Sequence, residues 1–74
     1  MAVEVEVFGQ LLPGQPRCRS LEIQGPATVR DLAQRIGVDL AEVGLVTVDG
    51  IQSKLDSPVH SNARLCFFPY LSGG

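Results

Sequence analysis

The segment TVRDLAQRIG, residues 28–37, gives the clearest indication of the fold, because its apolar residues have the spacing of one helix face. The residues at the i, i+3, i+4 and i+7 positions of this face are Val29, Leu32, Ala33 and Ile36. Thr28 is a typical N-cap with Asp31 in the place of the capping-box acid, and Gly37 is typical of a helix end with positive φ. We therefore expect one short helix whose apolar face packs on a sheet.

The segment before this helix predicts a β-hairpin. Residues 3–7 alternate Val with Glu, and residues 18–24 alternate again, so each has the period of a strand with one buried face. Between them, Pro13-Gly14 and Pro16 supply turn chemistry that reverses the chain.

The segment after the helix predicts three further strands. We expect one helical turn within residues 40–43, a strand over 45–48, a tight turn at Asp49-Gly50 and a short return strand at 51–52. Residues 54–62 are predicted to be a loop that ends at Asn62, which tolerates a left-handed backbone. The last strand is expected over 63–68, ended by Pro69 because proline has no N–H to pair.

These elements predict an α+β domain in residues 1–69, with a mixed sheet covered on one face by the main helix, and a tail in residues 70–74. The alternation assigns a core to the inward positions. The predicted core residues are Val3, Val5, Val7, Leu21, Ile23, Val29, Leu32, Ala33, Ile36, Val46, Val48, Leu65 and Phe67.

Length and composition restrict the classes of function. A chain of 74 residues and 7.9 kDa has room for one small domain, so a spacious catalytic pocket would compete with the core, and we do not expect an autonomous enzyme. The formal charge of -2 argues against nucleic acid as a partner. Without an apolar run of roughly 20 residues, we expect no membrane span and a cytoplasmic location.

Few side chains could carry chemistry inside the predicted domain. His60 is expected to be a solvated turn histidine, and Asp49 and Asp56 show no spacing that would pair them as acid and base. Glu4 and Glu6 are expected on a solvated strand face. With two cysteines and no Cys/His cluster of the right spacing, we expect neither a disulfide framework nor a zinc site.

The tail offers a different kind of reactive group. Gly73 and Gly74 lack Cβ atoms, so they can enter a narrow channel and leave a terminal carboxylate sterically open. That carboxylate, with an ordinary pKa of about 3.3 to 3.7, can attack the α-phosphorus of ATP without a base. The acyl adenylate could then react with sulfur to give a thiocarboxylate, or with a lysine to give an amide. An inert, frayed terminus is the structural alternative.

Residues 67–74, Phe-Phe-Pro-Tyr-Leu-Ser-Gly-Gly, carry a family resemblance. They are similar to the Phe-Phe-Pro-Pro-x-[Ser/Thr/Ala]-Gly-Gly ending of the molybdopterin synthase small subunit, one of the small sulfur carriers of the ubiquitin-like β-grasp superfamily. Residues 28–32 and 48–50 resemble the helix start and the Val-Asn-Gly turn of the same family. Two departures are Tyr70 in place of the second proline and Ser61-Asn62-Ala63 in place of Asp-Gly-Asp.

The resemblance implies a five-stranded β-grasp sheet and a role as a sulfur-carrying cosubstrate or small subunit of a synthase. It implies that Gly74 is adenylated by a ubiquitin-activating-like adenylyltransferase, which uses ATP and magnesium, and is thiocarboxylated with sulfur from a donor protein. The acceptor would be the large subunit of molybdopterin synthase or an equivalent enzyme, and this chain would bind no cofactor itself. Leu71, Ser72 and Gly73 would set the register of the tail in the partner's channel.

The resemblance also implies a docking surface on the outer face of the sheet. In a β-grasp sheet, Phe8 and Phe68 lie on neighbouring strands, and with Cys66 they would form an exposed apolar patch at the base of the tail. Cys18 and Cys66 would lie about two strand spacings, ~9.6 Å, apart, too far for a disulfide.

Three alternatives remain open. The chain could carry sulfur for thiamine or for another pathway, such as cysteine synthesis. It could be a protein modifier that forms isopeptide bonds through Gly74, as ubiquitin does. It could also be a plain β-grasp binding module with an inert tail.

Overall fold

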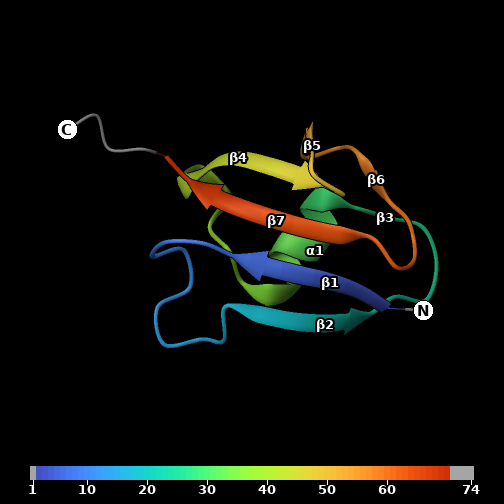
Figure 1. Ribbon diagram of the computed structural model, residues 1–74, viewed down its shortest axis with the longest axis horizontal. Helices are drawn as coiled ribbons and strands as arrows, with labels where there is room; N and C mark the ends of the chain where they lie inside the picture. The colour runs from blue at the N-terminus through green and yellow to red at the C-terminus, as the bar shows by residue number, and fades with distance from the viewer. Residues whose placement is uncertain (1, 71–74) are drawn as a thin grey trace.

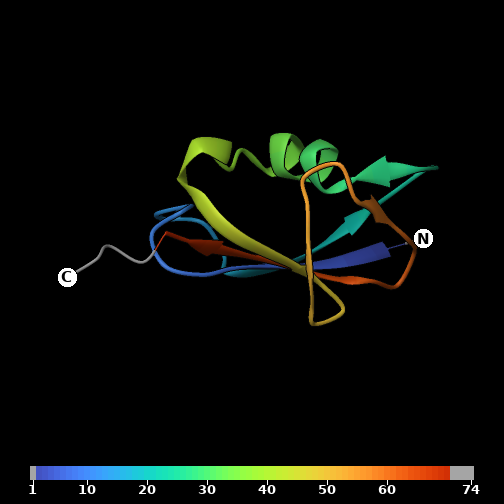
Figure 2. The same ribbon diagram turned by 90° about the horizontal axis from the view of Figure 1, so that it is seen from above.

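A computed structural model describes residues 2–70 of the chain and shows two layers, a sheet and a helix across one of its faces (Figures 1 and 2). The main sheet has five strands in the order β2-β1-β7-β4-β5, and a separate ladder pairs β3 with β6. The elements in chain order are β1 (Ala2–Val7), β2 (Cys18–Glu22), β3 (Ala27–Thr28), α1 (Val29–Ile36), the 3-10 turn η1 (Leu40–Glu42), β4 (Val43–Val48), β5 (Ile51–Ser53), β6 (Pro58–Val59) and β7 (Arg64–Pro69).

The sheet is mixed because β1 pairs in opposite senses with its two neighbours. It is antiparallel to β2, with Val3 opposite Leu21, and parallel to β7, with Val7 opposite Phe67. On its other side, β7 runs antiparallel to β4, which turns into β5. The turn uses Asp49 and Gly50 at φ of 53° and 81°, the left-handed pair that a two-residue hairpin requires. The predicted mixed five-stranded sheet with one main helix is confirmed.

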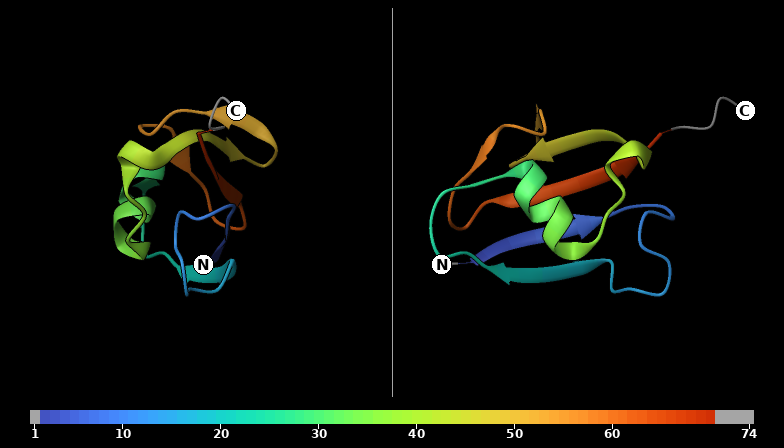
Figure 3. Two further views of the ribbon diagram at one scale, coloured as in Figure 1. Left: turned by 90° about the vertical axis from the view of Figure 1, so that its left-hand side faces the viewer. Right: turned by 180° about the vertical axis from the view of Figure 1, so that it is seen from behind.

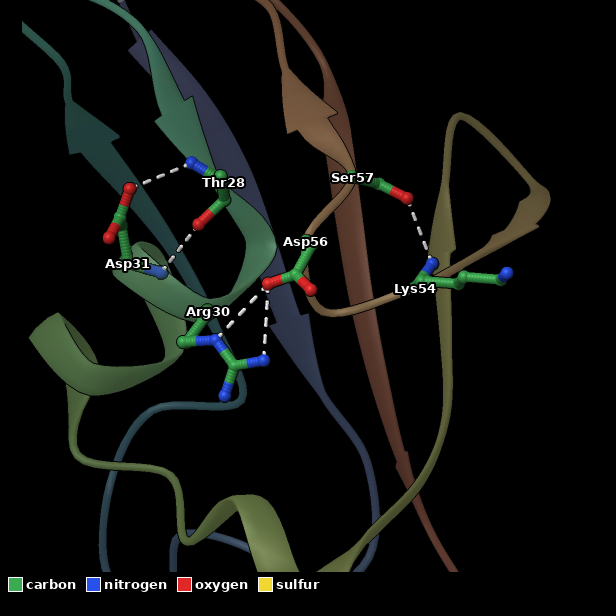
Figure 4. Close-up of polar contacts among 6 residues, drawn as sticks. All are labelled: Thr28, Arg30, Asp31, Lys54, Asp56 and Ser57. Carbon is green, nitrogen blue, oxygen red and sulfur yellow. Dashed lines mark hydrogen bonds and ion pairs between the residues drawn. The ribbon is translucent and has the colours of Figure 1, made fainter.

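Helix α1 begins and ends where the sequence predicts, and Figure 4 shows the contacts at its start. The Thr28 hydroxyl oxygen accepts a hydrogen bond from the Asp31 N–H at 3.2 Å, and the Asp31 carboxylate accepts one from the Thr28 N–H at 2.9 Å. At the other end, Gly37 has a φ of 90° and donates its N–H to the Ala33 carbonyl at 3.0 Å. These bonds satisfy backbone groups that the helix itself leaves unpaired.

Residues 54–62, predicted to be a loop, instead hold the start of the helix, so this prediction is wrong in part. The Val29 and Arg30 N–H groups donate to backbone carbonyls of residues 57 and 55 at 3.0 and 2.8 Å. Asp56 lies 3.1 Å from the Arg30 guanidinium, and the Ser57 hydroxyl accepts from the Lys54 N–H (Figure 4). Strand β6 then pairs with β3 and buries Val59. A two-residue strand is too short to show a period in the sequence.

The core lies between α1 and the sheet, as the alternation predicts. Eleven of the predicted core residues are buried, whereas Leu21 and Val48 are partly buried at its margin. The structure adds apolar residues that the prediction left out: Val38, Val43, Val59 and Ala63. Val38, Val43 and Val59 stand outside the predicted strands and helix, whereas Ala63 is the first residue of the predicted last strand and was not assigned to the core.

The end of the last strand differs from the prediction. Pro69 was expected to end the pairing, but it is the last residue of β7 and lies opposite Val43, because β4 begins two residues earlier than predicted. The register between β4 and β7 shifts between Val43 and Leu45, so Gly44 is the extra residue of a bulge. Proline is compatible with this position because bulges interrupt the regular ladder.

Two adjacent phenylalanines on β7 allow a direct test of this architecture. Phe67 is fully buried against α1, whereas Phe68 is half-buried on the opposite face. We predict that Phe67→Ala lowers the free energy of unfolding by about 3 to 5 kcal/mol. The matched variant Phe68→Ala should cost less than half as much, because its ring loses less buried area. Urea unfolding measures both values, and equal losses would contradict the assigned faces.

Candidate functional site

The predicted reactive tail begins where β7 ends. In the views of Figures 1 and 3, this end of β7 lies at the same end of the sheet as the connection between β1 and β2, and opposite the start of β1. Tyr70 follows β7 with 66% of its surface exposed. Four predicted site residues lie outside the described residues and stay predictions: Leu71, Ser72, Gly73 and Gly74.

The two phenylalanines predicted for docking form a stacked pair beside this end of β7. The ring centroids of Phe8 and Phe68 are 4.6 Å apart, and the ring planes differ by 5°. The Phe8 N–H donates to the Phe67 carbonyl at 2.9 Å, which extends the parallel pairing of β1 with β7 by one residue. The Arg17 guanidinium lies 5.9 Å from the centre of the Phe8 ring, within cation–π range. The predicted adjacency of Phe8 and Phe68 is confirmed.

Leu45 enlarges this apolar surface, and it was missing from the predicted site. It lies opposite Phe68 on β4 and is 36% exposed. Its place follows from strand parity, because Val46 and Val48 point inward and Leu45 therefore points outward. We call Phe8, Phe68 and Leu45 the aromatic patch. Next to it, an open groove of about 350 Å³ is lined by Gly44, Leu45, Phe68, Pro69 and Tyr70.

Cys66, predicted to be an exposed member of the docking patch, is buried. Only 8% of its surface is exposed, so it offers a partner almost no contact area. Glu6 lies opposite Cys66 in the sheet, and its carboxylate forms an ion pair with the Arg64 guanidinium. The pKa of Arg64 is raised, first by a hydrogen bond with the Cys66 sulfur and then by the charge of Glu6. The Glu6 side chain is therefore also largely covered, contrary to the expected solvated face.

The two cysteines are free, as expected. Cys18 and Cys66 both lie opposite Glu6, on the two strands that flank β1. A full strand therefore separates them, and no disulfide links them.

His60 was predicted to be a solvated turn histidine, and it is exposed, but the structure also gives it two partners that the sequence did not indicate. Its Nε2 lies 2.7 Å from a carboxylate oxygen of Asp49, and its Nδ1 lies 2.7 Å from the Ser61 carbonyl oxygen. The other Asp49 oxygen accepts from the Arg64 N–H at 2.9 Å. Spacing could not indicate the pair, because the β4–β5 turn and the segment before β7 meet only in the folded sheet.

This His60–Asp49 pair is suited to holding a turn rather than to transferring protons. Both ring nitrogens face acceptors, and only the protonated imidazole can donate to both. The pKa of His60 is raised, first by the Ser61 carbonyl and then by Asp49, while the pKa of Asp49 is lowered, first by the Arg64 N–H and then by His60. The pair therefore links the β4–β5 turn to the start of β7.

Within residues 2–70, no three His, Cys, Asp or Glu side chains gather closely enough to hold a metal ion. No helix in the same range is both long and apolar enough to cross a membrane.

Several solved structures have the same architecture, although no protein-family model and no curated protein matches the chain in sequence. SAMP1 from Haloferax volcanii aligns with a TM-score of 0.77 and 23% identity over 100% of both chains. A putative molybdopterin converting factor subunit 1 from Pyrococcus furiosus aligns with a TM-score of 0.72 and 23% identity over 95% of this chain and 98% of that chain. A chain in the complex of subunits 1 and 2 of the molybdopterin-converting factor from Helicobacter pylori aligns with a TM-score of 0.66 and 17% identity over 100% of both.

These likenesses establish the fold. The chain has the ubiquitin-like β-grasp architecture, which confirms the fold implied by the resemblance of residues 67–74. The alignments extend over essentially the whole of each chain, so the sheet, the helix and their order are all shared.

The His60–Asp49 pair makes stability depend on pH. The pKa of His60 is raised on folding. The pair therefore contributes its full stabilisation of the folded state below pH 6.5, the ordinary pKa of histidine, and loses it as the pH rises through the raised pKa. We therefore predict that wild type exceeds His60→Ala in melting temperature by more at about pH 5.5 than at about pH 8.5.

The matched control for this prediction is Asp56→Asn. It removes a carboxylate from the exposed Arg30 pair without touching His60, so its difference from wild type should not change over the same pH range. A pH-independent difference between wild type and His60→Ala would show that the pair does not titrate as described.

Proposed function

We propose that this protein is a sulfur carrier whose C-terminal glycine is adenylated and then converted to a thiocarboxylate. The observation that carries the proposal is a Gly-Gly sequence, residues 73–74, placed shortly after the last strand of a β-grasp sheet. Residues 67–74, which run from the end of the last strand to the Gly-Gly sequence, are similar to the ending of the molybdopterin synthase small subunit. We assign the sulfur first to molybdopterin biosynthesis for this reason.

The chemistry needs little from the carrier itself. The ionised Gly74 carboxylate attacks the α-phosphorus of ATP, and pyrophosphate leaves. Hydrosulfide, delivered by a donor protein, then attacks the Gly74 carbonyl carbon, so that a C–S bond replaces the C–O bond to AMP, AMP leaves and the thiocarboxylate remains. ATP and magnesium are held by a ubiquitin-activating-like adenylyltransferase, so this chain acts as cosubstrate, and the proposed location is the cytoplasm.

The aromatic patch is the proposed docking surface for both partners. Stacked aromatic rings offer a large, rigid contact area, and aromatic residues are enriched among those that dominate binding energy. The patch adjoins Tyr70, so a partner bound there has the following residues within reach. The Helicobacter pylori structure is a complex of subunits 1 and 2 of its molybdopterin-converting factor, which supports a large synthase subunit as the acceptor here.

Protein modification is the second candidate function. It is favoured by the structural likeness to SAMP1, a small archaeal modifier protein. In that case, the amine of a target lysine would attack the activated Gly74 carbonyl, and AMP would leave as an amide forms. Lys54 is the single lysine of the sequence, and its side chain is exposed. If copies of this chain were joined to one another through a lysine, each bond would therefore link Gly74 of one copy to Lys54 of the next.

We predict that deletion of Gly74 abolishes activation and leaves the fold unchanged. ATP–pyrophosphate exchange with the adenylyltransferase should fall to background, because the next carboxylate is placed one residue short, while the melting temperature stays that of wild type. Mass spectrometry of wild-type protein from cells should show exchange of one carboxyl oxygen for sulfur. A branched adduct on lysine would instead identify the modifier, and full activity of the deletion variant would exclude both functions.

We also predict that Phe8→Ala and Phe68→Ala weaken binding to the adenylyltransferase and the acceptor enzyme by about 10-fold or more, as expected for central interface aromatics. Titration calorimetry measures both dissociation constants. The matched control is Ile51→Ala, because Ile51 is 71% exposed but lies on β5, at the edge of the sheet beyond β4. Equal losses for all three variants would show that the patch is not the docking surface.

A further inference from the structure

Pro69, the last residue of β7, and Tyr70 after it are enclosed by two glycines from the segments on either side of β7. A methyl group at Gly9, after β1, would lie 2.6 Å from Cγ of Pro69. A methyl group at Gly44, in β4, would lie 2.8 Å from Cα and 2.9 Å from N of Tyr70. All three distances are well inside ordinary van der Waals contact. Neither position can carry a side chain while Pro69 and Tyr70 stay in place.

The two contacts restrain the chain in complementary ways. Gly44 is the extra residue of the β4 bulge and faces backbone atoms of Tyr70, which cannot move aside by rotating a side chain. Gly9 has a φ of 67° and faces the ring of Pro69, whose own φ is restricted by that ring. Pro69 and Tyr70 are therefore held from both sides, in position and in backbone direction.

The packing of the core does not explain this arrangement. Phe67 is the last fully buried side chain of β7, whereas Pro69 is half-buried and Tyr70 is largely exposed. Glycine in or beside a strand destabilises it, because glycine loses the most backbone freedom on folding. Two such residues are nevertheless used to restrain a segment beyond the core, at the point from which residues 71–74 continue.

We propose that Gly9 and Gly44 are positioning residues, which set the direction in which the C-terminal segment leaves the sheet relative to the aromatic patch. The inference rests on the proposed function. A partner that docks on the patch then meets Pro69 and Tyr70 already in a fixed place beside it, so these two residues need not be ordered when the partner binds the carboxylate. Less freedom has to be lost on binding, which lowers KM. The value of kcat is unaffected, because neither glycine touches the reacting atoms.

Each glycine has a matched control within the chain. Gly44→Ala is compared with Gly25→Ala, because Gly25 has no atom within 4 Å of an added methyl group and no positive φ. Gly9→Ala is compared with Gly14→Ala. Gly14 has a φ of 78° and open space around it, so both variants strain a left-handed backbone but only Gly9→Ala meets Pro69.

Two measurements on the full-length protein test the inference. The first is the NMR order parameter of the Tyr70 amide, which we expect to be about 0.85 in wild type, the value of a rigid backbone. It should fall toward about 0.6 in Gly44→Ala and Gly9→Ala but not in the controls. The second is ATP–pyrophosphate exchange with the adenylyltransferase. We expect the KM for the carrier to rise about 10-fold in Gly44→Ala and Gly9→Ala, with kcat within about twofold of wild type.

The outcomes separate this inference from the proposed function. If wild type supports exchange but Gly44→Ala and Gly9→Ala match their controls in KM, the positioning role is wrong and the sulfur-carrier proposal stands. An unchanged Tyr70 order parameter in both variants overturns the restraint itself. If wild type supports no exchange, the proposed function fails, and the positioning role fails with it. Should Gly44→Ala not fold, the comparison of Gly9→Ala with Gly14→Ala decides alone.

Discussion

The parallel pairing of β1 with β7 is the constraint on which the rest of the structure depends. It joins residues 4–7 to residues 64–67, so the two most distant strands of the chain lie side by side at the centre of the sheet. Such a pairing requires a long connection between the strands, and here that connection contains α1, which covers the apolar face the pairing creates. Burial of Val5, Leu65 and Phe67 against α1 then stabilises sheet and helix together.

The same pairing determines what a partner can meet on the outer face. Because β1 and β7 run in the same direction, Phe8, which follows β1, and Phe68, near the end of β7, lie at the same end of the sheet and stack. The segment after β7 therefore begins next to an apolar surface and at the middle of the sheet, with Gly9 on one side and Gly44 on the other. A strand at the sheet edge could have only one such neighbour. The central place of β7 thus explains both the patch and the restraint on Pro69.

Polar contacts occupy the middle of the sheet and the end away from the aromatic patch. At the end away from the patch, His60, Asp49 and the backbone of Arg64 tie the β4–β5 turn to the start of β7. Between the two ends, Arg64 and Glu6 cover Cys66. The contiguous apolar surface, the aromatic patch, therefore lies at the end from which the C-terminal segment leaves, whereas Ile51 on β5 is a single exposed apolar side chain. A contiguous apolar surface is more typical of an interaction site than single exposed side chains are.

The features that depend on neighbours in the chain could be predicted from the amino-acid sequence alone. The capping box of Thr28 and Asp31, the left-handed Gly37, the Asp49-Gly50 turn and the alternation of the strands all act over a few residues, so composition and spacing predict them. Only the tertiary structure decided the β3–β6 ladder, the burial of Cys66, the His60–Asp49 pair and the enclosure of Pro69 and Tyr70 by Gly9 and Gly44. Each of these joins segments that are far apart in the chain, and no local pattern records which distant strand becomes a neighbour.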